Sequence, residues 1–397
     1  IDVYSSLKQP LISHTKPRTS QSSDMMSTLP TIHIDKGVCF AIFAYDIGTA
    51  IHLDQADQLI TATKKRGRLK RKRSAPQYFD YRPPPLRISQ DLESLSIGVH
   101  HTLSTVDVVL YDFGAVSVIY PIPIEGEFSA LLPLSEALYE NKQLLDESGE
   151  RISHLLRTIQ SAVEKPTIAP FVEDYSIFHV ETTQPSLTAP QVLTPLTQDI
   201  AQILRCEREP LSDEEVRDST SCHISFGKSD ISFIDWNGAL IYGEEMEDVR
   251  AVLEFANVEL LERRYLDDQL DQTLDHAYDS LTKYQWKRFR WPGSFHADLR
   301  EIGQLQVDGA ILFERVTNSL KLLGDQYLAR VYRLTSQRLH LQGWDAGIHR
   351  KLETIESIYE KLAGLTGNRR MEVLEWIIII LITVSILLPF IPGFPGY

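Results

Sequence analysis

The order of hydrophobic and polar positions divides the chain into a strand-rich first part and a helix-rich second part. Residues 38–45 form an unbroken apolar run, which is typical of a strand buried on both faces. Residues 106–120 hold two more runs that are rich in β-branched and aromatic side chains. Asn237-Gly238 lies between two short alternating segments and is the strongest hairpin signal in the chain. These patterns place several strands within residues 31–242.

Helical segments are expected between these strands. One covers about 129–163, and a shorter one covers about 197–206. The alternation of strands and helices predicts an α+β head, in which a sheet is covered by helices. Two ferredoxin-like halves are one arrangement that such an order allows.

After Gly243 the strand patterns disappear. Apolar residues recur every three or four positions in three stretches that end near Tyr284, Leu334 and Leu362. This spacing predicts long, antiparallel, coiled-coil-like helices in a hairpin or bundle over residues 243–368. An acidic face on the first helix is expected to be solvated; it consists of Glu262, Asp267, Asp268, Asp271 and Asp275.

The last stretch of the chain is apolar and has no charged side chain after Glu375. A run of this length predicts a single transmembrane helix over residues 371–391. Arg369 and Arg370 precede it, so the positive-inside rule places the bulk of a tail-anchored protein in the cytoplasm or in a mitochondrial matrix. The alternatives are a buried core helix and an oligomerisation tail. The expected anchor residues are Trp376, Ile377, Ile378, Ile379, Ile380, Leu381, Ile382, Val384, Ile386, Leu387 and Leu388.

Composition narrows the class of protein only modestly. The chain is 43% hydrophobic and 24% charged, as expected of a folded protein, and its three cysteines form no CxxC motif. A reducing compartment fits that cysteine usage. Residues 1–30 are rich in Ser, Thr, Pro and Lys, which predicts a disordered leader; a mitochondrial presequence is the alternative.

One strongly basic block stands out from a chain whose net charge is −14. It is a solvated loop, a contact for anionic lipid at about 1 kcal/mol per basic residue, or a contact for RNA phosphate. The block contains no aromatic residue for base stacking, so lipid is favoured over RNA. Its basic residues are Lys64, Lys65, Arg66, Arg68, Lys70, Arg71, Lys72 and Arg73.

Motifs that carry chemistry are missing from the sequence. No glycine-rich phosphate loop, nucleophile elbow, HExxH or EF-hand pattern occurs. His100 and His101 are adjacent, but no further metal ligand is evident near them. We therefore expect a protein that is not an enzyme and that binds no metal or cofactor.

Two short motifs carry a family resemblance. Tyr111-Asp112-Phe113-Gly114 lies at a strand turn, and Leu374-Glu375-Trp376-Ile377 opens the terminal apolar run. Together they resemble the "required for meiotic nuclear division" family of membrane-anchored proteins, over about residues 38–391. The family's Pro-Xaa-Phe-Trp turn is not visible here, and the basic block is not associated with it. The resemblance implies an inner mitochondrial membrane protein that supports translation, without known catalytic residues.

These inferences combine into one functional prediction. The chain is expected to be a non-enzymatic scaffold or adaptor, anchored in a membrane at its C-terminus. Its expected partners are membrane lipid, further copies of itself and a protein at the membrane, with RNA as a weaker candidate. The alternative is a ligand-sensing or catalytic head, for which a deep polar pocket with converging carboxylates or histidines would be evidence.

Overall fold

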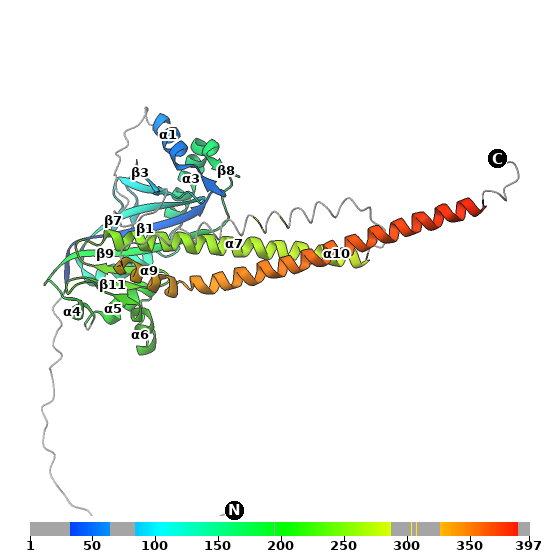
Figure 1. The fold of residues 1–397 in the computed structure, drawn as a ribbon. Helices are drawn as coiled ribbons and strands as arrows, with labels where there is room; N and C mark the ends of the chain where they lie inside the picture. The colour runs from blue at the N-terminus through cyan, green and yellow to red at the C-terminus, as the bar shows by residue number, and fades with distance from the viewer. Residues whose placement is uncertain are drawn as a thin grey trace, which may run out of the picture. The chain divides into compact units, whose positions relative to one another are not determined.

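β1 (His33–Asp46) is an interior strand of an eight-stranded mixed sheet, whose spatial order is β10-β11-β12-β9-β1-β7-β6-β3 (Figure 1). The computed structural model describes residues 32–63, 84–193, 195–286, 303, 307 and 326–387. All of these belong to the unit Ile32–Tyr397, which is separate from the unit Ile1–Thr31.

The other strands of the large sheet are β3 (Leu86–Asp91), β6 (Thr105–Leu110), β7 (Ala115–Glu127), β9 (Val172–Gln184), β10 (His223–Ile224), β11 (Ile231–Ile234) and β12 (Gly238–Tyr242). Two small ladders accompany it, formed by β2 (Ala50–Ile51) with β8 (Val163–Glu164) and by β4 (Ser96–Ile97) with β5 (His100–His101). The β11–β12 pair confirms the hairpin predicted at Asn237-Gly238, and β1 confirms the buried strand predicted at 38–45.

Strand pairing corrects the predicted architecture. β1 is antiparallel to both β7 and β9, so that Ile42 lies between Ile119 and Tyr175, while β12 runs parallel to β9. The strands therefore form one continuous mixed sheet. The expectation of two ferredoxin-like halves was wrong, because local strand patterns do not reveal which distant strands will pair.

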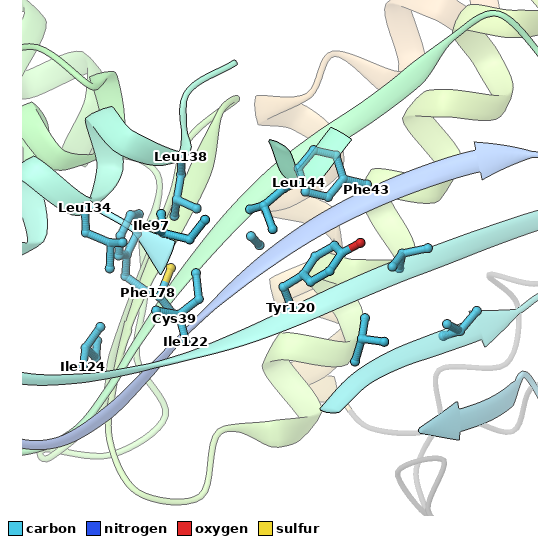
Figure 2. Packing of buried hydrophobic residues seen from close by; sticks show 14 of the residues in the cluster. Cys39, Phe43, Ile97, Tyr120, Ile122, Ile124, Leu134, Leu138, Leu144 and Phe178 are labelled. Atoms are coloured by element: carbon cyan, nitrogen blue, oxygen red, sulfur yellow. The ribbon is translucent and has the colours of Figure 1, made fainter. Parts of the chain in front are cut away.

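Both faces of β1 are buried. Alternate side chains of a strand point to opposite faces, and here Cys39 and Phe43 join one hydrophobic cluster while Ile42 and Ala44 join another. Figure 2 shows part of the first cluster, in which Phe43 and Tyr120 meet edge to face at 5.9 Å between ring centroids. An interior strand between two cores requires the continuous apolar run that the sequence shows.

The first cluster is covered by α1 (Leu53–Thr63), α2 (Leu131–Leu138), α3 (Lys142–Ile159), α4 (Ala189–Leu193) and α5 (Thr197–Arg205). The helix α3 illustrates how the sequence fixes such an element. Asn141 caps its first turn by accepting a hydrogen bond from the backbone N–H of Leu144 at 3.0 Å. Leu144 is then fully buried against the sheet, which contributes about 1.5–3 kcal/mol for a side chain of this size.

The second cluster is covered by three other helices. They are α7 (Glu247–Trp286), α9 (Gln326–Arg338) and α10 (Leu341–Leu387), which contribute Val252, Val331 and Leu341 among others. Residues 252–263 of α7 are buried on all sides, because the sheet lies against one side of the helix and α9 and α10 lie against others. Charged residues in this part of α7 are therefore enclosed.

The helices α7 and α10 run in the same direction. Arg263 of α7 pairs with Asp345 of α10 at 2.7 Å, and further along both helices Asp267 and Asp271 each lie 2.7 Å from the Lys351 ammonium. Residue numbers rise together along the two helices, and Figure 1 shows them side by side. This direction leaves the antiparallel prediction untested, because the first and third of three successive antiparallel helices also run in the same direction. Most of the second predicted helix, about 305–334, falls outside the described residues.

An ion-pair network fixes α9 to the β11–β12 turn. The carboxylate of Asp235, which is fully buried, lies 2.7 Å from Nε of Arg338 and 2.8 Å from Nε of Arg205. Asp218 of α6 (Asp213–Ser221) closes the network by contacting both guanidinium groups, at 2.6 and 2.8 Å. Two helices, α5 through Arg205 and α9 through Arg338, are thereby tied to one buried carboxylate, and α6 is tied to the same two arginines.

The C-terminal segment corrects the membrane prediction. Among the described residues, no helix has the length and apolar content needed to cross a bilayer. The apolar part of α10 that the structure describes, residues 376–387, is shorter than the roughly 18 residues required, and Arg370, Glu372 and Glu375 precede it in the same helix. The predicted anchor, its single-pass topology and the localisation based on that topology were therefore wrong. The expected leader, 1–30, lies outside the described residues.

Candidate functional site

The site that stands out is a pair of buried carboxyl groups where β1 ends against α7. Asp46 is the last residue of β1 and is 4% exposed, and Glu262 of α7 is 1% exposed. We call these two residues the carboxyl pair. The sequence placed Glu262 on a solvated acidic face, and this was wrong because the helix is enclosed there. Two other members of that predicted face, Asp267 and Asp271, contact Lys351, and Asp271 is exposed as predicted.

The surroundings of the carboxyl pair favour a bound proton. No described N–H or O–H group donates to either carboxyl oxygen of Glu262, whereas Asp46 accepts a hydrogen bond from the backbone N–H of Gly48. Two ionised carboxylates in contact would repel each other in a site without water. A proton on Glu262 would remove this repulsion and give the group a donor to direct at Asp46.

The pKa values follow from the same surroundings. Burial raises the pKa of Glu262 well above its usual value, the Asp46 charge raises it further, and Arg263 opposes the change. Burial also raises the pKa of Asp46, opposed by its hydrogen bonds with Gly48 and Glu262. The carboxyl pair therefore holds a proton at a pH where exposed carboxyls have lost theirs.

A second group of charges lies beside the carboxyl pair on α7. Glu259 is fully buried, and it accepts a hydrogen bond from the Tyr332 hydroxyl of α9 at 2.6 Å. Burial raises the pKa of Glu259 to about 7, against the opposing charge of Arg263. Arg263 also reaches Asp345 of α10, so this group joins α7 to both helices that pack on it. Tyr265 also lies near the carboxyl pair, and burial together with the Asp46 charge raises the pKa of its hydroxyl.

Nearer the start of α7, Glu254 ties the helix to the sheet. Its carboxylate contacts Arg87 of β3, which also lies 3.4 Å from Asp107 of β6, and it contacts Arg250 one turn earlier at 2.5 Å. The Arg250 guanidinium in turn lies 4.4 Å from the ring centroid of Phe40. Glu254 is therefore fully engaged in positioning α7.

Chemically, the carboxyl pair can hold and release a proton. Its two side chains are closed off from solvent, so it does not present a surface to a substrate. Among the described residues, no three His, Cys, Asp or Glu side chains form a group that could hold a metal ion. An open surface hollow lies elsewhere, on the outer side of α3, and is lined by Gly149, Glu150, Ser153, His154, Arg157 and Ile168.

The residues proposed from the sequence lie elsewhere. The basic block Lys64–Arg73 falls outside the described residues, so its contact with lipid or RNA stays a prediction. His101 on β5 is exposed, and its Nδ1 lies 3.2 Å from the Ser96 hydroxyl. Five of the expected anchor residues, Ile378 to Ile382, are 50–61% exposed on α10. None of these residues belongs to the carboxyl pair.

Comparison with known proteins places the sheet within a family. The family model described as "Uncharacterized protein MJ0711, N-terminal domain" matches residues 36–248, from β1 to the first turn of α7. The chain belongs to this family. Uncharacterized protein MJ0711 from Methanocaldococcus jannaschii is 23% identical over 255 residues, which cover 63% of this chain and 76% of that protein. No solved structure matches the chain.

Membership of the MJ0711 N-terminal domain family corrects the earlier resemblance. The assignment to the "required for meiotic nuclear division" family was wrong, because it rested on two motifs of four residues each. The second motif, Leu374 to Ile377, lies outside the matched range of 36–248. Asp46 lies inside that range, whereas Glu262 and the rest of α7 beyond its first turn lie outside it.

Proposed function

We propose that the protein is a non-enzymatic scaffold in which the sheet domain is joined rigidly to an arm of two helices. The arm is the part of α7 after Arg263 together with α10 from Asp345 onward. The observation that carries the proposal is the continuity of α7, whose first half is enclosed in the second core and whose second half leaves the sheet beside α10. No loop intervenes at that transition, so a movement of the domain moves the arm.

Packing along the arm supports its rigidity. Leu266, Leu270 and Thr273 of α7 are buried at spacings of four and three residues, and Ile348 and Ile355 of α10 are fully buried seven residues apart. This is the spacing of a coiled-coil seam. From Arg263 to Trp286 the arm is about 35 Å long at 1.5 Å per residue. A scaffold of this kind sets a fixed distance between its domain and whatever its outer end binds.

The carboxyl pair favours this proposal over a catalytic or ligand-sensing head. A general acid or base must come within about 3 Å of a substrate proton. Asp46 and Glu262 are 4% and 1% exposed, and the side chains around them belong to the packed core. The two carboxyl groups lie together because α7 packs against the end of β1.

The experiment is a distance measurement by pulsed electron paramagnetic resonance on the full chain. Spin labels are placed at exposed positions by Glu150→Cys on α3 and Glu353→Cys on α10. A Cys206→Ser background is used because Cys206 is half-buried, whereas Cys39 and Cys222 are buried. We expect a narrow distance distribution. A broad distribution in this protein would overturn the proposal.

A matched pair of variants tests the source of the rigidity. Lys351→Ala removes the contacts to Asp267 and Asp271 and should broaden the distribution. Lys361→Ala removes an exposed lysine from the same helix and should leave it narrow. Equal widths for the two variants would show that the ion pairs do not hold the arm.

A further inference from the structure

The outer part of α10 has no helix of its own chain described beside it. Ion pairs place Arg263 beside Asp345 and place Lys351 beside both Asp267 and Asp271, at offsets of 82, 84 and 80 residues. At these offsets the last residue of α7, Trp286, is level with about residues 366–370 of α10, since both helices rise 1.5 Å per residue. Residues 371–387, which we call the outer segment, therefore extend past α7.

The outer segment exposes large apolar side chains to solvent. Ile378, Ile379, Ile380, Leu381 and Ile382 are 51, 50, 56, 61 and 54% exposed. Ile378 and Leu381 are among these exposed residues, and because they are three positions apart they lie on one side of the helix. An apolar surface of this kind on a folded chain marks a binding site.

Four apolar positions of the outer segment fit the a and d spacing of a coiled coil. Met371, Leu374, Ile378 and Leu381 are spaced three, four and three residues apart, as are the a and d positions of a heptad. Isoleucine at a and leucine at d, as in Ile378 and Leu381, favour two parallel strands. The segment therefore fits a partner with the same heptad register.

Charge spacing indicates that this partner is an identical copy. With Ile378 at an a position, Arg370 falls at g and Glu375 falls at e of the following heptad. In a parallel, in-register pair, g of one helix faces e of the next heptad on the other helix. Two copies therefore bring Arg370 and Glu375 together twice, once on each side of the seam, and Glu375 is exposed.

We infer that the outer segment of α10 pairs in parallel and in register with the outer segment of a second copy of this chain. The inference rests on the proposed scaffold function and names the partner that its arm binds. The pairing joins two arms at their outer ends, and each arm leads back to its own sheet domain.

Molecular mass of the full chain in solution tests this inference, measured by sedimentation or by light scattering over a range of concentrations. A dimer is expected. The double variant Ile378→Asn with Leu381→Asn removes the a and d contacts and should give a monomer. Ile379→Asn with Ile380→Asn is the matched control, because it replaces equally exposed residues at the outward b and c positions, and it should remain a dimer.

Charge reversal tests the register. Arg370→Glu should weaken the dimer severalfold at low salt, Glu375→Arg should do the same, and the two together should restore it because each pair is re-formed with reversed signs. Oxidation of Leu381→Cys should cross-link two copies in a parallel, in-register pair. A wild-type monomer, a polydisperse aggregate, or equal loss of the dimer in both asparagine variants would overturn the inference.

The two experiments fail independently of each other. A monomer with a narrow spin-label distance leaves the rigid arm in place and removes only the pairing. A dimer with a broad distance keeps the pairing and removes the scaffold.

Discussion

Gly114 packs directly on the backbone of Gly48. A Cβ atom at Gly114 would lie 1.7 Å from the carbonyl oxygen of Gly48, and Gly114 has a φ of +111°. The contact holds the β6–β7 turn against the chain that leaves β1, where Ile47 N–H donates to the Gly114 carbonyl at 3.0 Å. Asp46 lies one residue before Ile47, so the close approach also positions the carboxyl pair.

Gly114→Ala should therefore destabilise the protein far more than alanine does at a glycine that has a positive φ but free space around it. Its backbone has a φ that side chains rarely adopt, and the clash with backbone atoms cannot be relieved by rotating a side chain. We expect a loss of more than about 4 kcal/mol of unfolding free energy, or failure to fold.

Gly126→Ala is the matched control, because its φ is +115° but no atom lies within 4 Å of the added Cβ. It should cost about 1–2 kcal/mol in chemical denaturation. Similar losses for the two variants would refute the packing argument.

The carboxyl pair should make stability depend on pH. Raised pKa values in the folded chain mean that it binds more protons than the unfolded chain above about pH 4. The contribution of the pair to stability is therefore complete below that pH and is lost as pH rises through the folded values. The slope is about 1.36 kcal/mol per pH unit for each proton released.

Glu262→Gln tests this dependence, because the amide can donate to Asp46 at any pH. Its melting temperature should fall less than that of the wild type between pH 5 and pH 8.5, and at pH 8.5 it should be more stable by about 1–3 kcal/mol. Glu150→Gln on the exposed side of α3 serves as the control and should follow the wild type. Parallel profiles for all three proteins would exclude a protonated pair.

The network around Asp235 should carry a large share of the stability of the β11–β12 side of the domain. Arg338→Ala leaves a fully buried carboxylate with one guanidinium partner instead of two. Losing one partner of a buried ion pair costs about 3–5 kcal/mol, and urea unfolding should show a loss of that order. Arg330→Ala, on an exposed position of the same helix, should change stability by about 0.5 kcal/mol or less. If Arg338→Ala is as mild as Arg330→Ala, the network is not a structural tie.

Local patterns in the sequence predicted individual elements well. The β11–β12 hairpin follows from Asn237-Gly238, because those two residues favour the backbone of a tight turn. β1 follows from the apolar run at residues 38–45, although the strand in the structure is longer than that run. Pairing between β1 and β9 could not be predicted, because the residues that pair lie far apart in the sequence; Ile42 and Tyr175 are 175 − 42 = 133 positions apart.

The candidate site escaped sequence analysis for a different reason. A carboxylate on a helix is usually solvated, and Glu262 belongs to a series of acidic residues of which Asp268 and Asp275 are not buried. Only the three-dimensional enclosure of residues 252–263 makes Glu262 different. A signal for this was that α7 has apolar residues on opposite sides in this region, such as Leu253 and Phe255, which indicates a helix covered all round. The membrane prediction failed because it treated the apolar run apart from the charged residues of the same helix.

The position of β1 between β7 and β9 has a consequence for synthesis on the ribosome. In β1, Tyr45 pairs with Val116 on one side and with Val172 on the other. The face of β1 that carries Ile42 and Ala44 is covered by α7, which begins at Glu247. At 5–20 residues per second, roughly 10–40 s separate the emergence of β1 from that of α7. Throughout that interval the face of β1 that carries Ile42 and Ala44 lacks its native cover. The domain therefore completes its folding only after α7 has been made.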